Sequence, residues 1–226
     1  METYDKIILY QYGKVGSMTL WKSNNGQHYH NKKDEYPEKF IHVHSHEVAK
    51  DVLAKYEDKK LLIINIVRLP IDRKLSGFFQ GIQRTLRSWD TISMDLLIKF
   101  ANTYSKISEL ERWMTDYFQI NDIDMNMQFD IENKHTIIKK NNKTFLFFRY
   151  EDYQHICQTI LYPKYGILYN NTTNIGDNKA SGLRYKEIKE AYKVSKAEEK
   201  YINNAFFVNK FYTKDEINQQ VNKYNK

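Results

Sequence analysis

A long aliphatic run constrains the fold of this chain more than any other feature. The segment "KKLLIINIVRLP" (residues 59–70) sets a series of Leu, Ile and Val residues between two lysines and a proline. A strand that is apolar on both faces is typical of the middle of a parallel sheet, because helices cover both faces of such a sheet. Pro70 ends this strand and can begin a helix. The run therefore predicts a sheet buried between helices.

Other strands and helices alternate along the chain. We expect strands at "KIILYQY" (6–12), "KFIHVHSH" (39–46) and "TFLFFRY" (144–150), and β structure more generally over 127–150. Helical spacing of apolar residues marks the segments 16–23, 45–58, 70–86, 93–119, 151–162 and most of 184–224, with Ser93 as an N-cap. This alternation predicts a three-layer α/β/α fold with a mostly parallel central sheet. We expect one domain over 1–226, with an α/β core over 1–165.

Composition supports a globular protein. The chain has 226 residues, of which 41% are hydrophobic and 28% charged, which is enough for one sizeable core and argues against disorder. Its single cysteine, Cys157, excludes an intramolecular disulfide and a cysteine-rich zinc site, and suits a reducing compartment. No segment approaches the roughly 20 apolar residues of a membrane span. We therefore expect a soluble, cytoplasmic protein with no integral membrane segment.

The net charge of +7 makes anionic partners plausible: nucleotides, acidic polysaccharide, nucleic acid or a membrane surface. Basic residues are spread along the chain with acidic residues between them, and no block resembles a basic arm. A solvated, lysine-rich surface explains the same charge. Charge alone does not choose between these interpretations.

A glycine-containing turn follows the first expected strand. In "YQYGKVGSMTLWK" (10–22) the order is strand, turn and helix, which is how many proteins hold a phosphate. The turn lacks the Gly-Lys-Ser/Thr ending of a Walker A loop, which argues against an ordinary kinase or ATPase. Arg68 lies at the carboxyl end of the aliphatic strand, where ligands collect in open α/β sheets. Ser76 lies two helical turns further on, where it could meet a second phosphate.

These segments resemble the sulfotransferases that use 3′-phosphoadenosine-5′-phosphosulfate (PAPS). "YGKVGSMTL" looks like their 5′-phosphosulfate loop, P-K-x-G-[ST]-[ST]-[ST], and "VRLPIDRKLSGFF" is similar to their 3′-phosphate motif, R-x-P-x-x-R-x-x-S. "FFRYEDY" and "KFYTKDEI" resemble two later segments of the family, Y-E-D-L and F-Y-S-x-E-I. Gly13 replaces the usual proline and Met18 a hydroxyl residue. The order and spacing of the four motifs agree over most of the chain.

The resemblance implies a P-loop-like sulfotransferase fold, PAPS as donor and adenosine 3′,5′-bisphosphate as product. It assigns to the 5′-phosphosulfate Lys14, Val15, Gly16, Ser17, Met18 and Thr19, and to the 3′-phosphate Arg68 and Ser76. Lys14 would supply positive charge to the leaving phosphate, as phosphoryl transfer also requires. Lys179 and Ser181 lie in a polar loop that could close over the nucleotide, within a C-terminal segment 166–226. The structural alternatives are a solvated Lys14, an Arg68–Asp72 ion pair and a solvent-facing Ser76.

"IHVHSH" (41–46) sets His42, His44 and His46 on one face of an expected strand. A zinc site is one interpretation, but Glu47 would face the other side, so we expect no metal. Hexuronyl 2-O-sulfotransferases carry a similar H-x-H segment whose second histidine is implicated as the base. The resemblance thus implies that His44 is the catalytic base, for which a pKa near 6.5 is suited. His42 and His46 are candidates for acceptor contact; an ordinary buried histidine is the alternative.

We expect Glu151 and Asp152 to cap the helix that follows them.

Taken with the resemblance, the residues predict an enzyme that moves a sulfuryl group from PAPS to a hydroxyl, on a carbohydrate, without nucleic acid as partner. Two alternatives stay open: an ATP-dependent kinase of P-loop type, and a non-catalytic module that binds anionic glycan or nucleic acid. The second would show steep salt dependence without nucleotide specificity.

Overall fold

The computed structural model describes residues 1–104, 107–169 and 182–225. The chain divides into two compact units, and each consists of two segments that are distant in sequence. The first unit contains Met1–Arg68 and Met114–Thr173, and the second contains Leu69–Trp113 and Asn174–Lys226. The two units are described separately below; the expected division at residue 165 stays a prediction.

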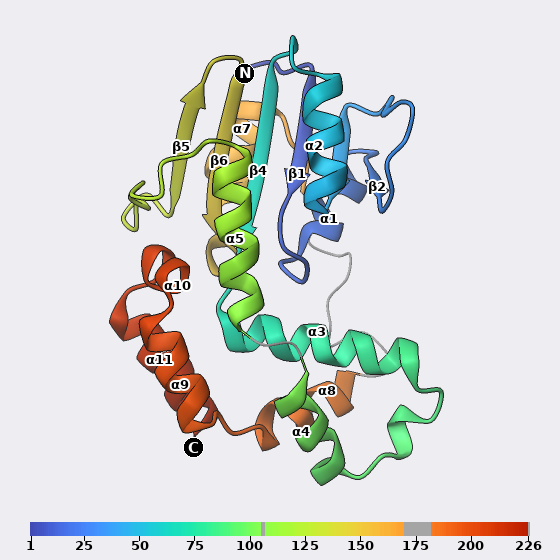
Figure 1. Ribbon diagram of the computed structural model, residues 1–226, viewed down its shortest axis with the longest axis vertical. Coiled ribbons are helices and arrows are strands. Elements are labelled where there is room, and N and C mark those ends of the chain that lie inside the picture. The colour runs from blue at the N-terminus through green and yellow to red at the C-terminus, as the bar shows by residue number, and fades with distance from the viewer. Residues whose placement is uncertain (105–106, 170–181, 226) are drawn as a thin grey trace. The chain divides into compact units, whose positions relative to one another are not determined.

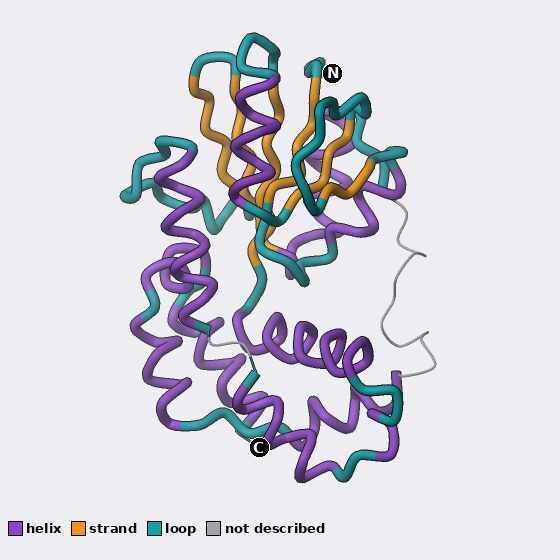
Figure 2. Tube along the Cα trace, turned by 45° about the vertical axis from the view of Figure 1, so that its right-hand side comes forward, coloured by secondary structure: helices purple, strands orange, loops and turns teal. Residues whose placement is uncertain are grey.

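A mostly parallel sheet forms the centre of the first unit (Figures 1 and 2). Six strands of the described chain follow the order β2-β3-β1-β4-β6-β5, and only the β5–β6 pair is antiparallel. Their bounds are β1 Lys6–Tyr10, β2 Gln27–Tyr29, β3 Phe40–Val43, β4 Leu61–Val67, β5 His135–Lys140 and β6 Lys143–Arg149. All residues of β4 are buried, as its aliphatic run predicts. The predicted α/β class with a mostly parallel sheet is confirmed.

Helices cover both faces of this sheet. In Figure 1, α2 (His46–Lys55) and α5 (Ser108–Ile120) lie in front of the strands and α7 (Tyr162–Tyr165) lies behind them. Tyr117 of α5 packs on Tyr10 of β1 with ring centroids 4.7 Å apart, on one face. On the other face, Leu9 of β1 shares a core cluster with Leu20 of α1 (Ser17–Ser23). Burying each such side chain contributes about 1.5–3 kcal/mol, and the result is the predicted three-layer arrangement.

Several elements differ from the sequence-based expectation. The β structure expected over 127–150 begins only with β5 at His135, and the sequence predicts no strand at β2. Strand β3 ends at Val43, because the Ser45 hydroxyl accepts hydrogen bonds from the backbone N–H groups of Glu47 and Val48 and so begins α2. The expected strand over 39–46 is therefore wrong in its last residues. The expected helix over 93–119 is divided into α4 (Met94–Thr103) and α5, with Ser93 as the predicted N-cap.

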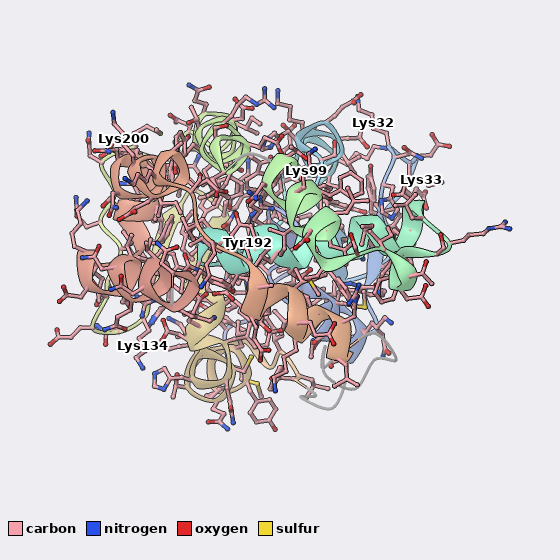
Figure 3. The ribbon with its side chains drawn as sticks, turned by 90° about the horizontal axis from the view of Figure 1, so that it is seen from below. Lys32, Lys33, Lys99, Lys134, Tyr192 and Lys200 are labelled. Carbon is pink, nitrogen blue, oxygen red and sulfur yellow. The ribbon has the colours of Figure 1, made fainter. Side chains whose placement is uncertain are left out.

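The described part of the second unit is helical. Besides α4 and the first residues of α5, its elements are α3 Pro70–Thr85, η1 Trp89–Thr91, α8 Gly182–Ala191, α9 Lys196–Asn204, α10 Phe206–Phe211 and α11 Lys214–Tyr224. Lys74 of α3 is buried, and its ammonium donates to Glu198 at 2.5 Å and to the Tyr192 hydroxyl at 3.0 Å. Tyr192 is labelled in Figure 3. The Asp72 carboxylate accepts from the Tyr224 hydroxyl of α11 at 2.7 Å. Buried polar contacts thus join α3 to the C-terminal helices.

The remaining helical turns follow β6 in the first unit, in the order η2 Tyr150–Asp152, α6 Tyr153–Ile156, η3 Cys157–Leu161 and α7. They form the predicted helical segment over 151–162, with a π-helical stretch at η3. Cys157 is buried in the same core cluster as Leu20. Among the described helices, none has both the length and the apolar character needed to cross a bilayer.

Candidate functional site

Three of the four motif segments meet where β1, β4 and β6 end. Arg68 follows β4, and its Nη1 donates to the backbone carbonyl of Lys14, in the turn after β1, at 3.0 Å. The Arg68 guanidinium lies over the ring of Tyr150, which follows β6, with its carbon 4.4 Å from the ring centroid. Residues that are far apart in sequence therefore form one contiguous group at the carboxyl edge of the sheet.

The strand order makes this edge a favourable place for a ligand. Strands β3 and β2, which follow β1 in the chain, lie on one side of β1. Strands β4 and β6 lie on its other side, so the strand order reverses between β1 and β4. Ligands of open α/β sheets bind outside the carboxyl ends of strands at such a reversal of strand order. Lys14 and Arg68 follow the two strands that flank the reversal. The topology thus supports a ligand site at the predicted residues.

The turn after β1 has an unusual backbone. Lys14 has φ 74° and Gly16 has φ 78°, and both lie in the left-handed region. A Cβ at Gly16 would lie 2.5 Å from Cε2 of Tyr150, so this position requires glycine for space as well as conformation. Lys14 has no such freedom, and a left-handed backbone at a non-glycine residue costs on the order of 1–3 kcal/mol. Such strain is commonly kept where it serves a function.

The other predicted donor residues differ in exposure. Val15 is buried and packs in the core, so it can contribute only through its backbone. Ser17 and Thr19 are buried and Met18 is half-buried at the start of α1. Ser76 is half-buried on α3, in the second unit, and its part in the site stays a prediction. Lys179 and Ser181 lie outside the described residues.

Asp72, the alternative partner of Arg68, has a structural role in the second unit. Its carboxylate accepts hydrogen bonds from three residues of α11, Gln220, Lys223 and Tyr224. Burial favours protonation of Asp72, but these bonds outweigh it and hold its pKa below the usual value. A charged Asp72 therefore anchors α11 to α3.

His44 lies beside the turn after β1. Its Nδ1 is 2.8 Å from the backbone carbonyl oxygen of Gln11. Because a carbonyl oxygen can only accept a hydrogen bond, Nδ1 carries the proton, and Nε2 of the neutral ring carries the lone pair. A Cβ at Gly13 would lie 3.9 Å from this Nε2. Burial lowers the pKa of His44, the hydrogen bond to the Gln11 carbonyl opposes that change, and the electrostatic influence of His30 and Lys14 adds to it. His44 is thus neutral at pH 7 and can accept a proton next to the turn.

His28 and His42 join His44 in one cluster. His28 of β2 is directly opposite His42 of the neighbouring strand β3, with ring centroids 4.2 Å apart. The His44 ring lies 4.5 Å from that of His42 and 4.9 Å from that of His28. Burial lowers the pKa of His42 well below its usual value, and burial with the charges of His44 and His30 lowers that of His28 to about 4.

Sequence reasoning missed the place of His28. Its strand, β2, has only three residues, too few to show an alternating pattern. The exposed His30 ring contacts that of His28 in a tilted arrangement, with a centroid distance of 4.1 Å. The available signal was His28 and His30 two residues apart, the spacing that places side chains of a strand on one face.

The sequence predicted that His46 shares a strand face with His42 and His44, and this prediction is wrong. His46 is the first residue of α2, and its Nδ1 is hydrogen-bonded to the hydroxyl of Tyr10. Its Nε2 lies 3.9 Å from the carboxylate of Asp116 on α5. The reason is the Ser45 N-cap, which turns the chain from strand to helix one residue before His46.

The acidic pair after β6 also differs from expectation. Asp152 makes no side-chain capping bond to the helix; its carboxylate instead accepts from Nε of Arg149 at 2.5 Å and lies 3.7 Å from Nζ of Lys134. The prediction of a capping role for Asp152 is therefore wrong. Arg149 is buried, and Asp152 compensates its charge. The two partners of this ion pair lie on either side of Tyr150 in the sequence, and Tyr150 is the residue that contacts Arg68.

Comparison with known proteins adds one distant likeness. No protein-family model and no curated protein matches the chain. Among solved structures, the chain is similar to the crystal structure of a sulfotransferase from Alicyclobacillus acidocaldarius, with 9% identity over 96% of this chain and 95% of that chain and a TM-score of 0.40. At this level of similarity the likeness does not assign the chain to a family.

Proposed function

We propose that the protein is a PAPS-dependent sulfotransferase that transfers a sulfuryl group to a hydroxyl of a saccharide. The observation that carries the proposal is the hydrogen bond from Arg68 to the carbonyl of Lys14. The two residues belong to the motifs that resemble the 3′-phosphate and 5′-phosphosulfate sites. A donor with phosphates on the 3′ and 5′ carbons of one ribose needs Arg68 and Lys14 to be neighbours, and they are.

Arg68 suits the 3′-phosphate. Its Nη1 is engaged by the Lys14 carbonyl, while its buried Nε has no hydrogen-bond partner among the described residues. Guanidinium groups bind phosphate through several N–H donors in a fixed plane, and stacking on the Tyr150 ring holds that plane in place. Ser76 and Lys179 are the further residues proposed to contact the nucleotide.

Lys14 and His44 are proposed to act on opposite ends of the transfer. The bond from sulfur to the leaving phosphate oxygen breaks as a bond from sulfur to the acceptor oxygen forms. Lys14 would stabilise the negative charge that develops on the leaving oxygen. His44 would take the acceptor's hydroxyl proton on Nε2, while the Gln11 carbonyl keeps its Nδ1 protonated. The products are a sulfate ester, adenosine 3′,5′-bisphosphate and a protonated His44.

Calorimetric titration tests the donor site. We expect adenosine 3′,5′-bisphosphate to bind more tightly than AMP or ATP, and Arg68→Ala to weaken this binding tenfold or more, because hydrogen bonds to charged groups contribute about 1.5–3 kcal/mol. Arg87→Ala is the matched control, since Arg87 is an exposed arginine outside the motifs. Preferred binding of ATP would favour a kinase. Equal, strongly salt-dependent binding of all three nucleotides would favour an anion-binding module.

A further inference from the structure

The histidine cluster has a feature that a proton acceptor does not need. One ring nitrogen from each of His28, His42 and His44 can be chosen so that all three lie within 4.8 Å of one another. Two of the rings come from adjacent strands in direct register, and the third follows β3 by one residue. A single base requires His44 alone, so the convergence of His28 and His42 on it needs a separate reason.

Two of these rings, His28 and His42, have incomplete hydrogen bonding within the described part of the chain. Both nitrogens of His42 and Nε2 of His28 are buried without a hydrogen-bond partner among the described residues. His42 is only 2% exposed, so bulk water does not solvate its ring. Leaving a buried polar atom unpaired costs about 1–3 kcal/mol. The cluster therefore presents several nitrogen lone pairs or N–H groups, from two strands, to a common space.

His44 shows how the cluster is oriented. The Gln11 carbonyl fixes its Nδ1 as the protonated nitrogen and directs Nε2 as the electron-pair donor. Histidines that bind metals commonly donate the other ring N–H to a backbone carbonyl or carboxylate in this way, which sets the tautomer and ring orientation. The Trp21 ring stacks at 6.1 Å from that of His42, which limits the rotation of the central ring.

We propose that His28, His42 and His44 together bind one divalent transition-metal ion, Zn²⁺ in the first instance, through one nitrogen each. Imidazole nitrogen is a preferred ligand of Zn²⁺, Co²⁺, Ni²⁺ and Cu²⁺ and a poor one for Mg²⁺ and Ca²⁺. Three histidines with a water in the fourth position form a known type of zinc site. Two nitrogens on a tetrahedral zinc lie about 3.3 Å apart, whereas these nitrogens lie within 4.8 Å of one another. Small ring rotations that shorten the longest separation by about 1.5 Å would therefore close the cluster.

The metal site rests on the geometry of the three rings and does not depend on the proposed transferase activity. If the protein both binds the metal and transfers sulfuryl groups, the two functions compete, because the metal would use the lone pair on Nε2 that His44 needs as a base. Bound metal would then inhibit sulfuryl transfer, and a chelator would restore it. Metal binding and nucleotide binding are measured separately, so failure of one leaves the other in place.

Cobalt titration of tag-free, chelator-treated protein tests the proposal. We expect one equivalent of Co²⁺ to bind with the intense visible absorption of tetrahedral Co²⁺, and one equivalent of Zn²⁺ to abolish that absorption by displacement. Wild-type protein that binds neither ion, or that binds several equivalents with only the weak absorption of octahedral Co²⁺, would overturn the proposal. This experiment needs no variant and therefore stands even if substitutions in the cluster impair folding.

Substitutions then assign the ligands. His28→Gln, at a half-buried position on a short strand, should weaken Co²⁺ binding at least tenfold and remove the tetrahedral absorption. His155→Asn removes an exposed histidine outside the cluster and should leave both unchanged. Circular dichroism confirms that each variant is folded. Tetrahedral Co²⁺ absorption that persists in folded His28→Gln would contradict the three-histidine site.

Discussion

Two buried polar clusters of this protein satisfy their hydrogen bonds very differently. In the second unit, Lys74 donates to Glu198 and Tyr192, and Glu198 in turn accepts from the Tyr192 hydroxyl. In the first unit, His42 has no hydrogen-bond partner for either ring nitrogen among the described residues. A fully paired cluster holds helices together and needs nothing else. A cluster with unpaired nitrogens carries a cost in stability that a structural role does not explain, and it therefore points to a ligand or to chemistry.

The largest effect that separates the clusters should be on catalysis. His44→Asn keeps a polar side chain beside Gln11 but removes the proposed base, and we expect the rate of sulfuryl transfer from PAPS to fall by about 10²–10⁴-fold. The free energy of unfolding should change far less than the rate. The rate is measured as transfer of radiolabelled sulfate to a panel of saccharides, with His155→Asn as the control variant. Full activity in folded His44→Asn would show that His44 is not the base.

The Lys74 cluster should show the converse. Lys74→Met leaves Glu198 charged and half-buried without its cation, and removal of one partner of a buried pair costs about 3–5 kcal/mol. Urea denaturation measures the loss, and binding of adenosine 3′,5′-bisphosphate to the folded fraction reports on the donor site. The double variant Lys74→Met/Glu198→Leu should recover much of the stability, because an apolar pair can replace a buried ion pair at little cost. A single variant as stable as wild type would contradict the structural role.

The sequence predicted the parts of the first unit that depend on local pattern. The aliphatic run gave the buried central strand β4, and the position of Arg68 after that strand followed from the end of the run. The meeting of Arg68 with the turn after β1 follows from parallel pairing of the two strands, which places their carboxyl ends at the same edge. These features are predictable because each is fixed by periodicity or by strand direction.

Sequence reasoning grouped His42 with His44 but missed His28, and it missed the Lys74 cluster entirely, because both clusters depend on contacts between distant segments. His28 meets His42 only because a three-residue strand pairs with β3 in one register, and a shift by one residue would turn it to the other face. Lys74 and Glu198 are separated by 124 residues, and neither stands out in its own helix. The Ser45 cap that ends β3 was locally visible, since a serine before a helical pattern is a common N-cap.

The pH dependence of stability should also distinguish the clusters. The lowered pKa values of His28, His42 and His44 mean that the unfolded chain, with histidine pKa near 6.5, binds more protons than the folded chain. Their contribution is fully present above pH 6.5 and is lost as the pH falls through their lowered pKa values, of which that of His28 is about 4, by at most about 1.4 kcal/mol per pH unit for each ring. His28→Gln should reduce this slope in chelator-treated protein. An unchanged slope between pH 6.5 and 5 would contradict neutral burial of His28.

The Lys74 cluster should lose stability in a lower pH window. Burial raises the pKa of Glu198, but the hydrogen bonds and charge of Lys74 and the bond from Tyr192 outweigh it, so its pKa lies below the usual value. Its contribution is present above the unfolded pKa of about 4.3 and is lost as the pH falls below it. Glu198→Gln should therefore leave the slope between pH 6.5 and 5 as in wild type. A change of that slope would show that the two clusters are not independent.

The smallest effect should be the most informative about His42. Replacing a buried, unpaired polar group with an apolar one of similar volume is nearly neutral or stabilising, because the cost of leaving the group unpaired disappears. We therefore expect His42→Leu in chelator-treated protein to change the free energy of unfolding by no more than about 1 kcal/mol. Unlike Lys74→Met, it should not destabilise the protein. Urea denaturation without metal measures this, and repetition with one equivalent of Zn²⁺ should stabilise wild type but not the variant, since only a native-state ligand shifts the unfolding equilibrium. A loss of several kcal/mol without metal would mean that the His42 nitrogens are satisfied by ordered water inside the protein, and that the cluster resembles the Lys74 network after all.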